Sequence, residues 1–310
     1  MGIVVIGAVF VDIKGYPEGA YIPGGRNAGT VEYTHGGVGR NVAEDIANVE
    51  LRPTLVSLVD QTGTGSDVVN KLNNHKVNTK YMRATKDGMG TWLAVFNSNG
   101  DVTASSSKRP NLLPSAQILD EQGDEIFANA DSIILEIDVE KEIVKRTFAL
   151  AKKYNKKVYA VVSNMSIALE RRDFFQSLDC FVCNRQEAGM MFYDDYEGKT
   201  PDEMMDILAE RIKSARITSM IVTLGAAGAV YAHVNGEKGW CPARKVEVRD
   251  TTGAGDAFCA GAVIGLTHGK TMAEACRIGS TLSASVITTC ESVCPRFQPR
   301  ELGLDIDVMD

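Results

Sequence analysis

The stretch of the chain that decides the fold is Asp250-Thr251-Thr252-Gly253-Ala254-Gly255-Asp256-Ala257-Phe258. It follows Lys245–Val248, which we expect to form a strand, and it leads into the apolar helical pattern of Ala257–His268. Small residues therefore stand where a helix begins, and the unpaired N–H groups and dipole of a helix start favour a bound anion. Gly253 and Gly255 carry no Cβ atom, so the backbone there can approach a phosphate closely.

Two carboxylates frame this anion site. Asp256 falls in the first turn of the expected helix, and Asp250 stands just before the glycines. An isolated acid in a first turn commonly does no more than stabilise the helix start. Beside a phosphate, however, a carboxylate is repelled unless it takes a proton from a nucleophile, which is the work of a general base in phosphoryl transfer. The pattern therefore indicates Asp256 as a general base.

Short apolar runs alternate with helical patterns along the 310 residues. The main expected strands are Ile3–Gly7, Thr54–Val59, Trp92–Phe96, Ser132–Ile137, Lys157–Val162, Cys180–Cys183, Ser219–Leu224 and Ala229–Ala232. Apolar residues at helical spacing, such as Val42, Ile46 and Val49, fill the intervals between most of these strands. Such alternation predicts a single α/β domain, residues 1–310, with a mostly parallel sheet covered by helices on both faces.

Two segments interrupt this alternation. Residues 11–34 are rich in glycine and proline, with short β-prone pieces between them. Residues 91–106 form two β-prone runs around Asn97–Asp101, whose Asn-Gly pair is a hairpin signal. Together the two segments predict a small sheet that projects from the main one. Over the carboxyl ends of the parallel strands it would act as a lid.

Composition and charge exclude several classes of protein. Apolar residues make up 44% of the chain, charged residues make up 24%, and the net charge is −7. This acidic balance argues against a nonspecific nucleic-acid or membrane-surface binder, since both need a basic face. No apolar run reaches the roughly 18 residues of a membrane span. Met1–Gly7 reads as a buried strand and not as a signal peptide, so we expect a cytoplasmic protein.

Four motifs carry a family resemblance. Besides residues 250–258 they are Gly36-Gly37-Val38-Gly39-Arg40-Asn41, Asn184-Arg185-Gln186-Glu187 and Thr223-Leu224-Gly225-Ala226-Ala227-Gly228. In this order they resemble the motifs of the ribokinase-like (PfkB) family of carbohydrate and nucleoside kinases, and the resemblance runs from Asp12 to Pro295. It implies a ribokinase-like three-layer α/β sandwich, with a mostly parallel central sheet and a small β-sheet lid.

The resemblance also implies roles around the transferred phosphoryl group. Asp256 would deprotonate the acceptor hydroxyl, and the N–H groups of Gly253, Ala254 and Gly255 would form the anion hole. The acceptor's hydroxyl groups would be bound under the lid by Asp12, Gly37 and Asn41. Asp12 closely follows the first strand, where open α/β sheets bind their ligands. Taken alone, the Gly36-Gly37 pair is equally typical of a plain turn between a strand and a helix.

For the nucleotide half, the resemblance implies ATP, Mg²⁺ and a monovalent cation, K⁺. The implied ATP-binding residues are Asn184, Thr223, Gly225 and Gly228. Glu187, together with Asn184, would organise Mg²⁺ through water, although a helix-capping pair is an alternative interpretation of these two residues. Asp250 and Thr252 match positions that often coordinate a monovalent cation. We also expect a homodimer formed through the lid.

The acceptor is less well defined by sequence. Val42-Ala43-Glu44, Val161-Val162-Ser163 and the stretch Thr289–Pro295 resemble pseudouridine kinases, so the expected reaction is phosphorylation of the 5′-hydroxyl of pseudouridine. The chain departs from that pattern in lacking Asp-Pro before Val162-Ser163 and in having Cys294 before Pro295. A ribokinase- or fructokinase-type sugar kinase and a non-catalytic nucleotide-binding regulator remain alternatives. A dinucleotide-dependent oxidoreductase is disfavoured, because Gly37–Val42 lacks the third glycine of that fingerprint.

Overall fold

The computed structural model describes residues 2–97 and 102–306. In this part of the chain a nine-stranded sheet has the order β13-β12-β11-β10-β9-β8-β1-β4-β5. Its strands are, in the same order, Lys238–Cys241, Ala229–His233, Ser219–Thr223, Cys180–Asn184, Lys157–Val161, Ala130–Glu136, Gly2–Ile6, Thr54–Asp60 and Met82–Thr85. Neighbouring strands are parallel from β11 to β5, while β12 runs antiparallel to both β11 and β13. The expected mostly parallel sheet is confirmed.

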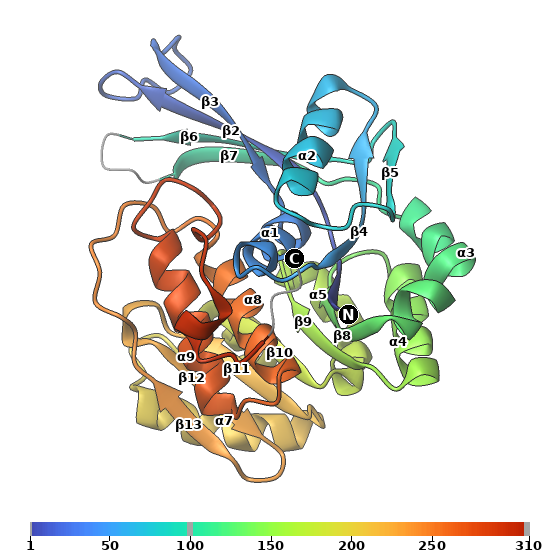
Figure 1. Cartoon of the computed structure of the whole chain (residues 1–310). Coiled ribbons are helices and arrows are strands. Elements are labelled where there is room, and N and C mark those ends of the chain that lie inside the picture. Colours follow the sequence, from blue (N-terminus) through green and yellow to red (C-terminus); the bar gives the residue numbers. More distant parts are fainter. Residues whose placement is uncertain (1, 98–101, 307–310) are drawn as a thin grey trace.

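Helices cover both faces of this sheet and give the three layers seen in Figure 1. One face packs against α1 (Val38–Asn48), α2 (Gly63–Asn74), α8 (Ala254–Thr267) and α9 (Met272–Val286). The other packs against α3 (Pro114–Ala128), α4 (Lys141–Tyr154), α5 (Met165–Ala168), α6 (Arg185–Phe192) and α7 (Pro201–Ala215). Strand β1 contributes side chains to the hydrophobic cores on both faces of the sheet. Ile3 and Val5 point into one core, and Val4 and Ile6 point into the other. Among the described residues, no helix combines the length and apolar character needed to cross a membrane.

The sequence predicted most of the central strands but not the edges of the sheet. Strands β5 and β13 were not expected, since each has four residues and too few alternations to stand out. The prediction of a strand at Lys245–Val248 is wrong. These residues form an exposed segment without regular structure, which is part of neither sheet in the described part of the chain.

A second, four-stranded sheet projects from the main body (Figure 1). Its order is β3 (Gly29–Gly36), β2 (Phe10–Pro17), β6 (Gly90–Phe96) and β7 (Val102–Lys108). This is the small sheet expected from residues 11–34 and 91–106. Strands β6 and β7 pair antiparallel, and residues 98–101 of the predicted turn lie outside the described residues.

The two faces of the small sheet differ in character. On β2, Asp12 and Lys14 are buried and face the main body, while Val11 and Ile13 alternate with them on the outer face. The inner face thus presents charged side chains to the carboxyl ends of the parallel strands. This arrangement places the small sheet beside the glycine-rich start of α8.

Candidate active site

Gly253 fixes the loop that precedes α8. It is the N-cap residue of that helix and has a φ of 81°, a left-handed conformation that favours glycine. A Cβ atom at this position would lie 2.0 Å from the carbonyl oxygen of Ser292. The glycine therefore lets the loop pack directly on the segment that follows α9.

The start of α8 opens into a pocket that is also lined by three of the four predicted nucleotide residues, but not by Asn184. Ala254 and Gly255 line this pocket together with Thr223, Gly225 and Gly228. A Cβ atom added at Gly255 would meet nothing within 4 Å, so the helix start has free space in front of it. The Ala254 N–H donates to the carbonyl of Thr251 at 3.2 Å, a long bond within the loop. The glycine loop before α8 and the segment Thr223–Gly228 thus line the same pocket.

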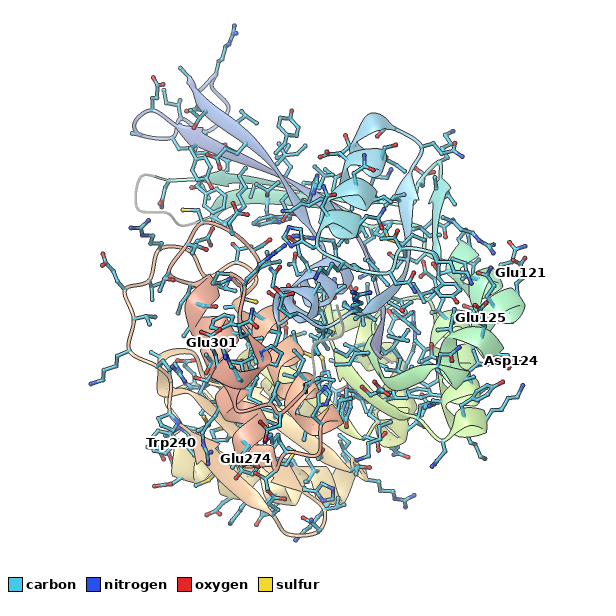
Figure 2. All side chains as sticks on the ribbon, viewed as in Figure 1. Glu121, Asp124, Glu125, Trp240, Glu274 and Glu301 are labelled. Carbon is cyan, nitrogen blue, oxygen red and sulfur yellow. The ribbon has the colours of Figure 1, made fainter. Side chains whose placement is uncertain are left out.

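The 3₁₀ turn Gly225–Ala227 is held from outside by the edge of the sheet. Trp240 of β13 lies on the surface in Figure 2, and its indole N–H donates to the carbonyl of Ala227 at 2.7 Å. The unexpected strand β13 therefore supports the predicted nucleotide loop.

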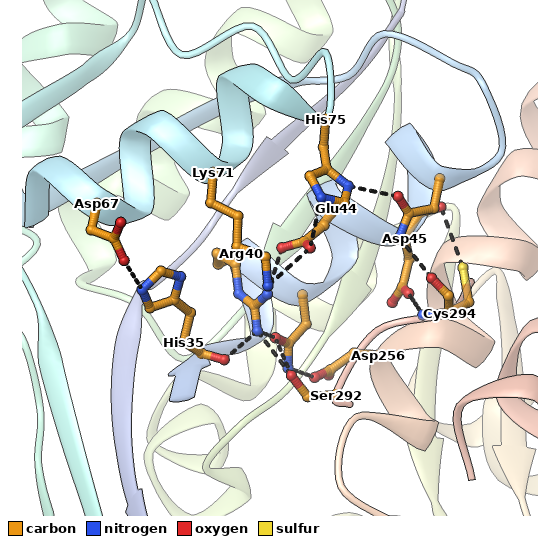
Figure 3. Close-up of polar contacts among 12 residues, drawn as sticks. His35, Arg40, Glu44, Asp45, Asp67, Lys71, His75, Asp256, Ser292 and Cys294 are labelled. Atoms are coloured by element: carbon orange, nitrogen blue, oxygen red, sulfur yellow. Dashed lines mark hydrogen bonds and ion pairs between the residues drawn. The ribbon is translucent and has the colours of Figure 1, made fainter. Parts of the chain in front are cut away.

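Asp256 meets Asn41 across the interface between α8 and α1 (Figure 3). The Asn41 amide nitrogen donates to Oδ2 of Asp256 at 2.7 Å. Burial raises the pKa of Asp256 to about 6, the charge of Asp12 acts in the same direction, and the Asn41 hydrogen bond and Arg40 charge oppose them. A carboxylate with this pKa is ionised at neutral pH yet accepts a proton readily, as a general base must.

Arg40 organises this pair, although the sequence did not mark it as a site residue. Its side chain is 1% exposed and forms an ion pair with Glu44. The guanidinium also donates to the carbonyl of His35, to Oδ1 of Asn41 and, at 2.9 Å, to Oγ of Ser292 (Figure 3). Because Arg40 occupies the amide oxygen of Asn41, the amide nitrogen is the atom turned toward Asp256. In the sequence, Arg40 could be noticed only as a member of the motif Gly36–Asn41. The motif does not show that the arginine side chain is buried.

Asp12 and Gly37 lie at the junction between the small sheet and α1. The Asp12 carboxylate packs over Gly36, where a Cβ atom would lie 2.3 Å from Oδ2. Burial raises the pKa of Asp12, while the charges of Lys14 and Arg40 lower it. Gly37 is the N-cap of α1 with a φ of 95°. The expected acceptor-binding residues Asp12, Gly37 and Asn41 therefore line one junction that leads to Asp256.

Asn184 and Glu187 form the capping box that was the alternative interpretation of this pair. The Glu187 N–H donates to Oδ1 of Asn184 at 2.8 Å, and the Asn184 N–H donates to Oε2 of Glu187 at 2.7 Å. Burial raises the pKa of Glu187, and the negative charges of Asp138 and Asp256 raise it further. The carboxylate is thus both a helix cap and a neighbour of the candidate base.

Two further acidic residues, Glu136 and Asp138, lie at the end of β8 and were not predicted as site residues from the sequence. Glu136 accepts the Ala8 N–H at 2.7 Å, and burial together with the charge of Asp138 raises the pKa of Glu136 to about 8. Asp138 accepts hydrogen bonds from the backbone and hydroxyl of Ser163, both at 2.9 Å. These contacts tie the loops after neighbouring strands together. The sequence feature that could have indicated Glu136 and Asp138 is their position as acidic residues at the end of an apolar strand.

The donors for a metal ion are sparse. Among the described residues, no three His, Cys, Asp or Glu side chains are grouped so that they could hold one. The negative charge shared by Glu187, Asp138 and Asp256 suits a Mg²⁺ ion that is bound mainly by water and substrate phosphates. These side chains would therefore hold a divalent ion only together with water and substrate phosphates.

Asp250 and Thr252, the expected cation ligands, bond to each other and to the small sheet. Oδ1 of Asp250 accepts the Thr252 N–H at 2.8 Å and the Thr252 hydroxyl at 2.7 Å. Oδ2 of Asp250 lies 3.3 Å from Nζ of Lys14 on β2. Lys14 had not been singled out in the sequence.

The layered sheet, the glycine-rich helix start and the carboxylate beside it are the arrangement expected of a kinase of the ribokinase-like fold. The family model described as "pfkB family carbohydrate kinase" matches residues 2–295, and the chain belongs to this family. It is therefore a phosphotransferase whose acceptor is an alcohol.

The relatives include nucleoside and sugar kinases. The guanosine-inosine kinase of Exiguobacterium acetylicum is 30% identical over 292 residues, covering 94% of this chain and 95% of that protein. The pseudouridine kinase of Escherichia coli K12 is 24% identical over 291 residues, covering 93% and 91%. Among solved structures, Arabidopsis thaliana ribokinase complexed with ribose and ATP aligns with a TM-score of 0.85 at 20% identity, over 97% of this chain and 98% of that one. The expected fold and enzyme class are confirmed.

Proposed function

We propose that this enzyme transfers the γ-phosphoryl group of ATP to the 5′-hydroxyl of a nucleoside. The observation that carries the proposal is an aromatic surface on the inner face of the small sheet. Tyr16 and Phe96 stack there with ring centroids 5.0 Å apart, and Trp92 meets Phe96 edge-on at 6.3 Å. Trp92 is the cross-strand partner of Asp12.

This surface suits a nucleobase better than a bare sugar. Aromatic rings bind bases by stacking, whereas a free pentose or hexose presents mainly hydroxyl groups. The base would lie against the rings while Asp12 and Asn41 accept and donate hydrogen bonds to the ribose hydroxyls. In this arrangement the small sheet acts as a lid over the acceptor and excludes water.

The proposed chemistry divides the work between positioning and proton removal. Asp12 and Asn41 would hold the sugar so that its primary hydroxyl reaches Asp256, which takes the hydroxyl proton as the oxygen attacks the γ-phosphorus. The helix start at Gly253–Gly255 would stabilise negative charge on the transferred group. Mg²⁺ would neutralise charge on the bridging phosphates, held near Asn184 and Glu187 through water.

A purine nucleoside is the first candidate acceptor, because the guanosine-inosine kinase matches 94% of this chain at 30% identity. Pseudouridine is the second candidate, supported by the match to a pseudouridine kinase at 24% identity. An enzyme that consumes ATP would act in the cytoplasm, as the sequence predicts. A regulator that has lost turnover is disfavoured, because Asp256 keeps both its hydrogen bond to Asn41 and its place at the helix start.

We also propose that two copies of the chain associate through the outer face of the small sheet. Apolar side chains are exposed on that face, among them Val31, Tyr33 and Leu93. An exposed apolar face of this kind marks a surface for association.

The test is a screen for ADP release with guanosine, inosine, pseudouridine, ribose and fructose as acceptors, in the presence of Mg²⁺. The proposal expects the highest kcat/KM for guanosine or inosine, and release at least about 10²-fold slower with the Asp256→Asn variant. Preference for ribose or fructose over every nucleoside contradicts the nucleoside assignment and leaves the family assignment standing.

A further inference from the structure

Lys14 carries a positive charge from the small sheet into the loop before α8. Its side chain is 4% exposed, on the inner face of β2, two positions from Asp12. Its Nζ lies 3.3 Å from Oδ2 of Asp250, across 236 positions of sequence. A buried ammonium needs such a partner, because desolvation penalises an unpaired charge heavily.

The same carboxylate is the one that the family resemblance assigns to a monovalent cation. Its other oxygen, Oδ1, accepts both the N–H and the hydroxyl of Thr252. Burial acts to raise the pKa of Asp250, but the Thr252 hydrogen bonds and the Lys14 charge outweigh it and hold the pKa below its usual value. Both carboxylate oxygens thus have donors, and the Lys14 ammonium already compensates the negative charge of Asp250. The residues present do not fit an additional K⁺ ion on Asp250.

We propose that the Lys14 ammonium is a built-in replacement for the monovalent cation of this loop. An ammonium carries the same charge as K⁺ and donates hydrogen bonds where K⁺ would accept oxygen ligands. It neutralises Asp250 and so fixes the segment that leads to Gly253 and the anion-binding helix start. Lys14 and Asp12 lie on the same face of strand β2, so the position of the Lys14 ammonium is fixed relative to the Asp12 carboxylate. The rate measurements that test this inference depend on the proposed kinase function.

The first experiment compares initial rates of the unaltered enzyme in K⁺ and in tetramethylammonium at equal ionic strength. The expected rates differ by less than about twofold. Lys14→Met, which keeps the length of the side chain and removes its charge, should lose at least about tenfold in kcat in tetramethylammonium, which corresponds to about 1.4 kcal/mol of activation free energy. K⁺ or NH₄⁺ should restore part of that loss in the Lys14→Met variant and change nothing in the unaltered enzyme.

A matched control is Lys108→Met. Lys108 is another lysine of the small sheet, paired with Asp87 at 2.9 Å, but its side chain is 61% exposed. This variant should keep the rate of the unaltered enzyme in both salts. Lys14→Arg retains the charge and should remain independent of K⁺, which tests the charge even where Lys14→Met folds poorly.

A second readout needs no turnover. The melting temperature of the Lys14→Met variant should rise in K⁺ relative to tetramethylammonium, whereas that of the unaltered protein should not. A severalfold K⁺ activation of the unaltered enzyme overturns the proposal, and so does a Lys14→Met variant that K⁺ neither activates nor stabilises. Where no acceptor is phosphorylated at all, the proposed function fails, and the melting comparison still decides the role of Lys14.

Discussion

The side-chain nitrogen of Asn41 lies 2.7 Å from the carboxylate of Asp256, and this contact joins the first helix of the domain to the helix that carries the glycine-rich loop. Arg40 sets the direction of the bond by occupying the amide oxygen of Asn41. The acceptor side and the phosphate side of the site therefore meet at one carboxylate.

Replacing Asp256 by Asn should lower kcat by at least about 10²-fold, the usual scale for a lost general base. Asn is nearly isosteric but cannot take the hydroxyl proton. ATP binding and the melting temperature should be retained, since the variant removes a half-buried charge and keeps the side-chain volume. Steady-state kinetics and calorimetric ATP titration check both parts. Asp124→Asn, which alters a surface carboxylate paired with Lys153, is the control and should keep full activity.

The pH dependence follows from the pKa of Asp256, which burial raises to about 6. The base works only when ionised, so kcat/KM should be high above this pH and fall as the pH drops through about 6. The residual rate of Asp256→Asn should not show this step. A pH profile of the unaltered enzyme that stays flat between pH 5 and 8 would show that Asp256 is not the titrating base.

Arg40 is a positioning residue, and its role can be separated from its contribution to stability. Arg40→Met should destabilise the fold by about 3–5 kcal/mol, because the Glu44 carboxylate is left buried with its main charge partner removed. Adding Glu44→Gln should restore much of the melting temperature, since the unpaired charge is gone. Turnover should stay low in the double variant, because the amide oxygen of Asn41 then lacks the guanidinium that orients it. Full activity in the double variant would assign Arg40 a purely structural role.

The aromatic surface of the small sheet should distinguish nucleosides from sugars. Trp92→Ala should raise the KM for a nucleoside acceptor by about tenfold, in line with the loss of one base–aromatic stack. The KM for ATP should not change, because the nucleotide residues Thr223, Gly225 and Gly228 lie elsewhere. Leu93→Ala changes the neighbouring residue, which is 45% exposed on the opposite face, and serves as the control for strand β6. Equal effects of the two substitutions on acceptor KM would argue against base stacking.

The outer face of the small sheet gives a prediction about assembly. Tyr33 is 71% exposed and Leu93 is 45% exposed, and an acid at both positions should prevent apolar association. We expect the unaltered chain to sediment as a dimer and the Tyr33→Asp, Leu93→Asp double variant as a monomer, measured by analytical ultracentrifugation. A monomeric unaltered chain contradicts the dimer proposal.

Much of the architecture was predictable from local patterns. The helix starts at Val38 and Ala254 follow glycines that make a left-handed turn, and the apolar runs of β1, β8 and β10 contribute to cores on both faces of the sheet. These features depend on backbone sterics and hydrophobic periodicity within a few neighbouring residues, so they can be recognised in the sequence alone. The same reasoning failed at Lys245–Val248, because a β-prone run forms a strand only where another strand is available for pairing.

The sequence by itself determined most of the central strands and helices, the glycine loop and the identity of the carboxylate beside it. Tertiary structure alone decided that Lys14 reaches Asp250 and that Arg40 is buried against Asn41 and Ser292. Each of these contacts depends on burial, or on partners more than 200 positions away in the chain, such as Asp250 for Lys14. Charge pairing in a folded interior is set by which side chains the packing brings within a few ångströms. No local pattern in the chain encodes that distance.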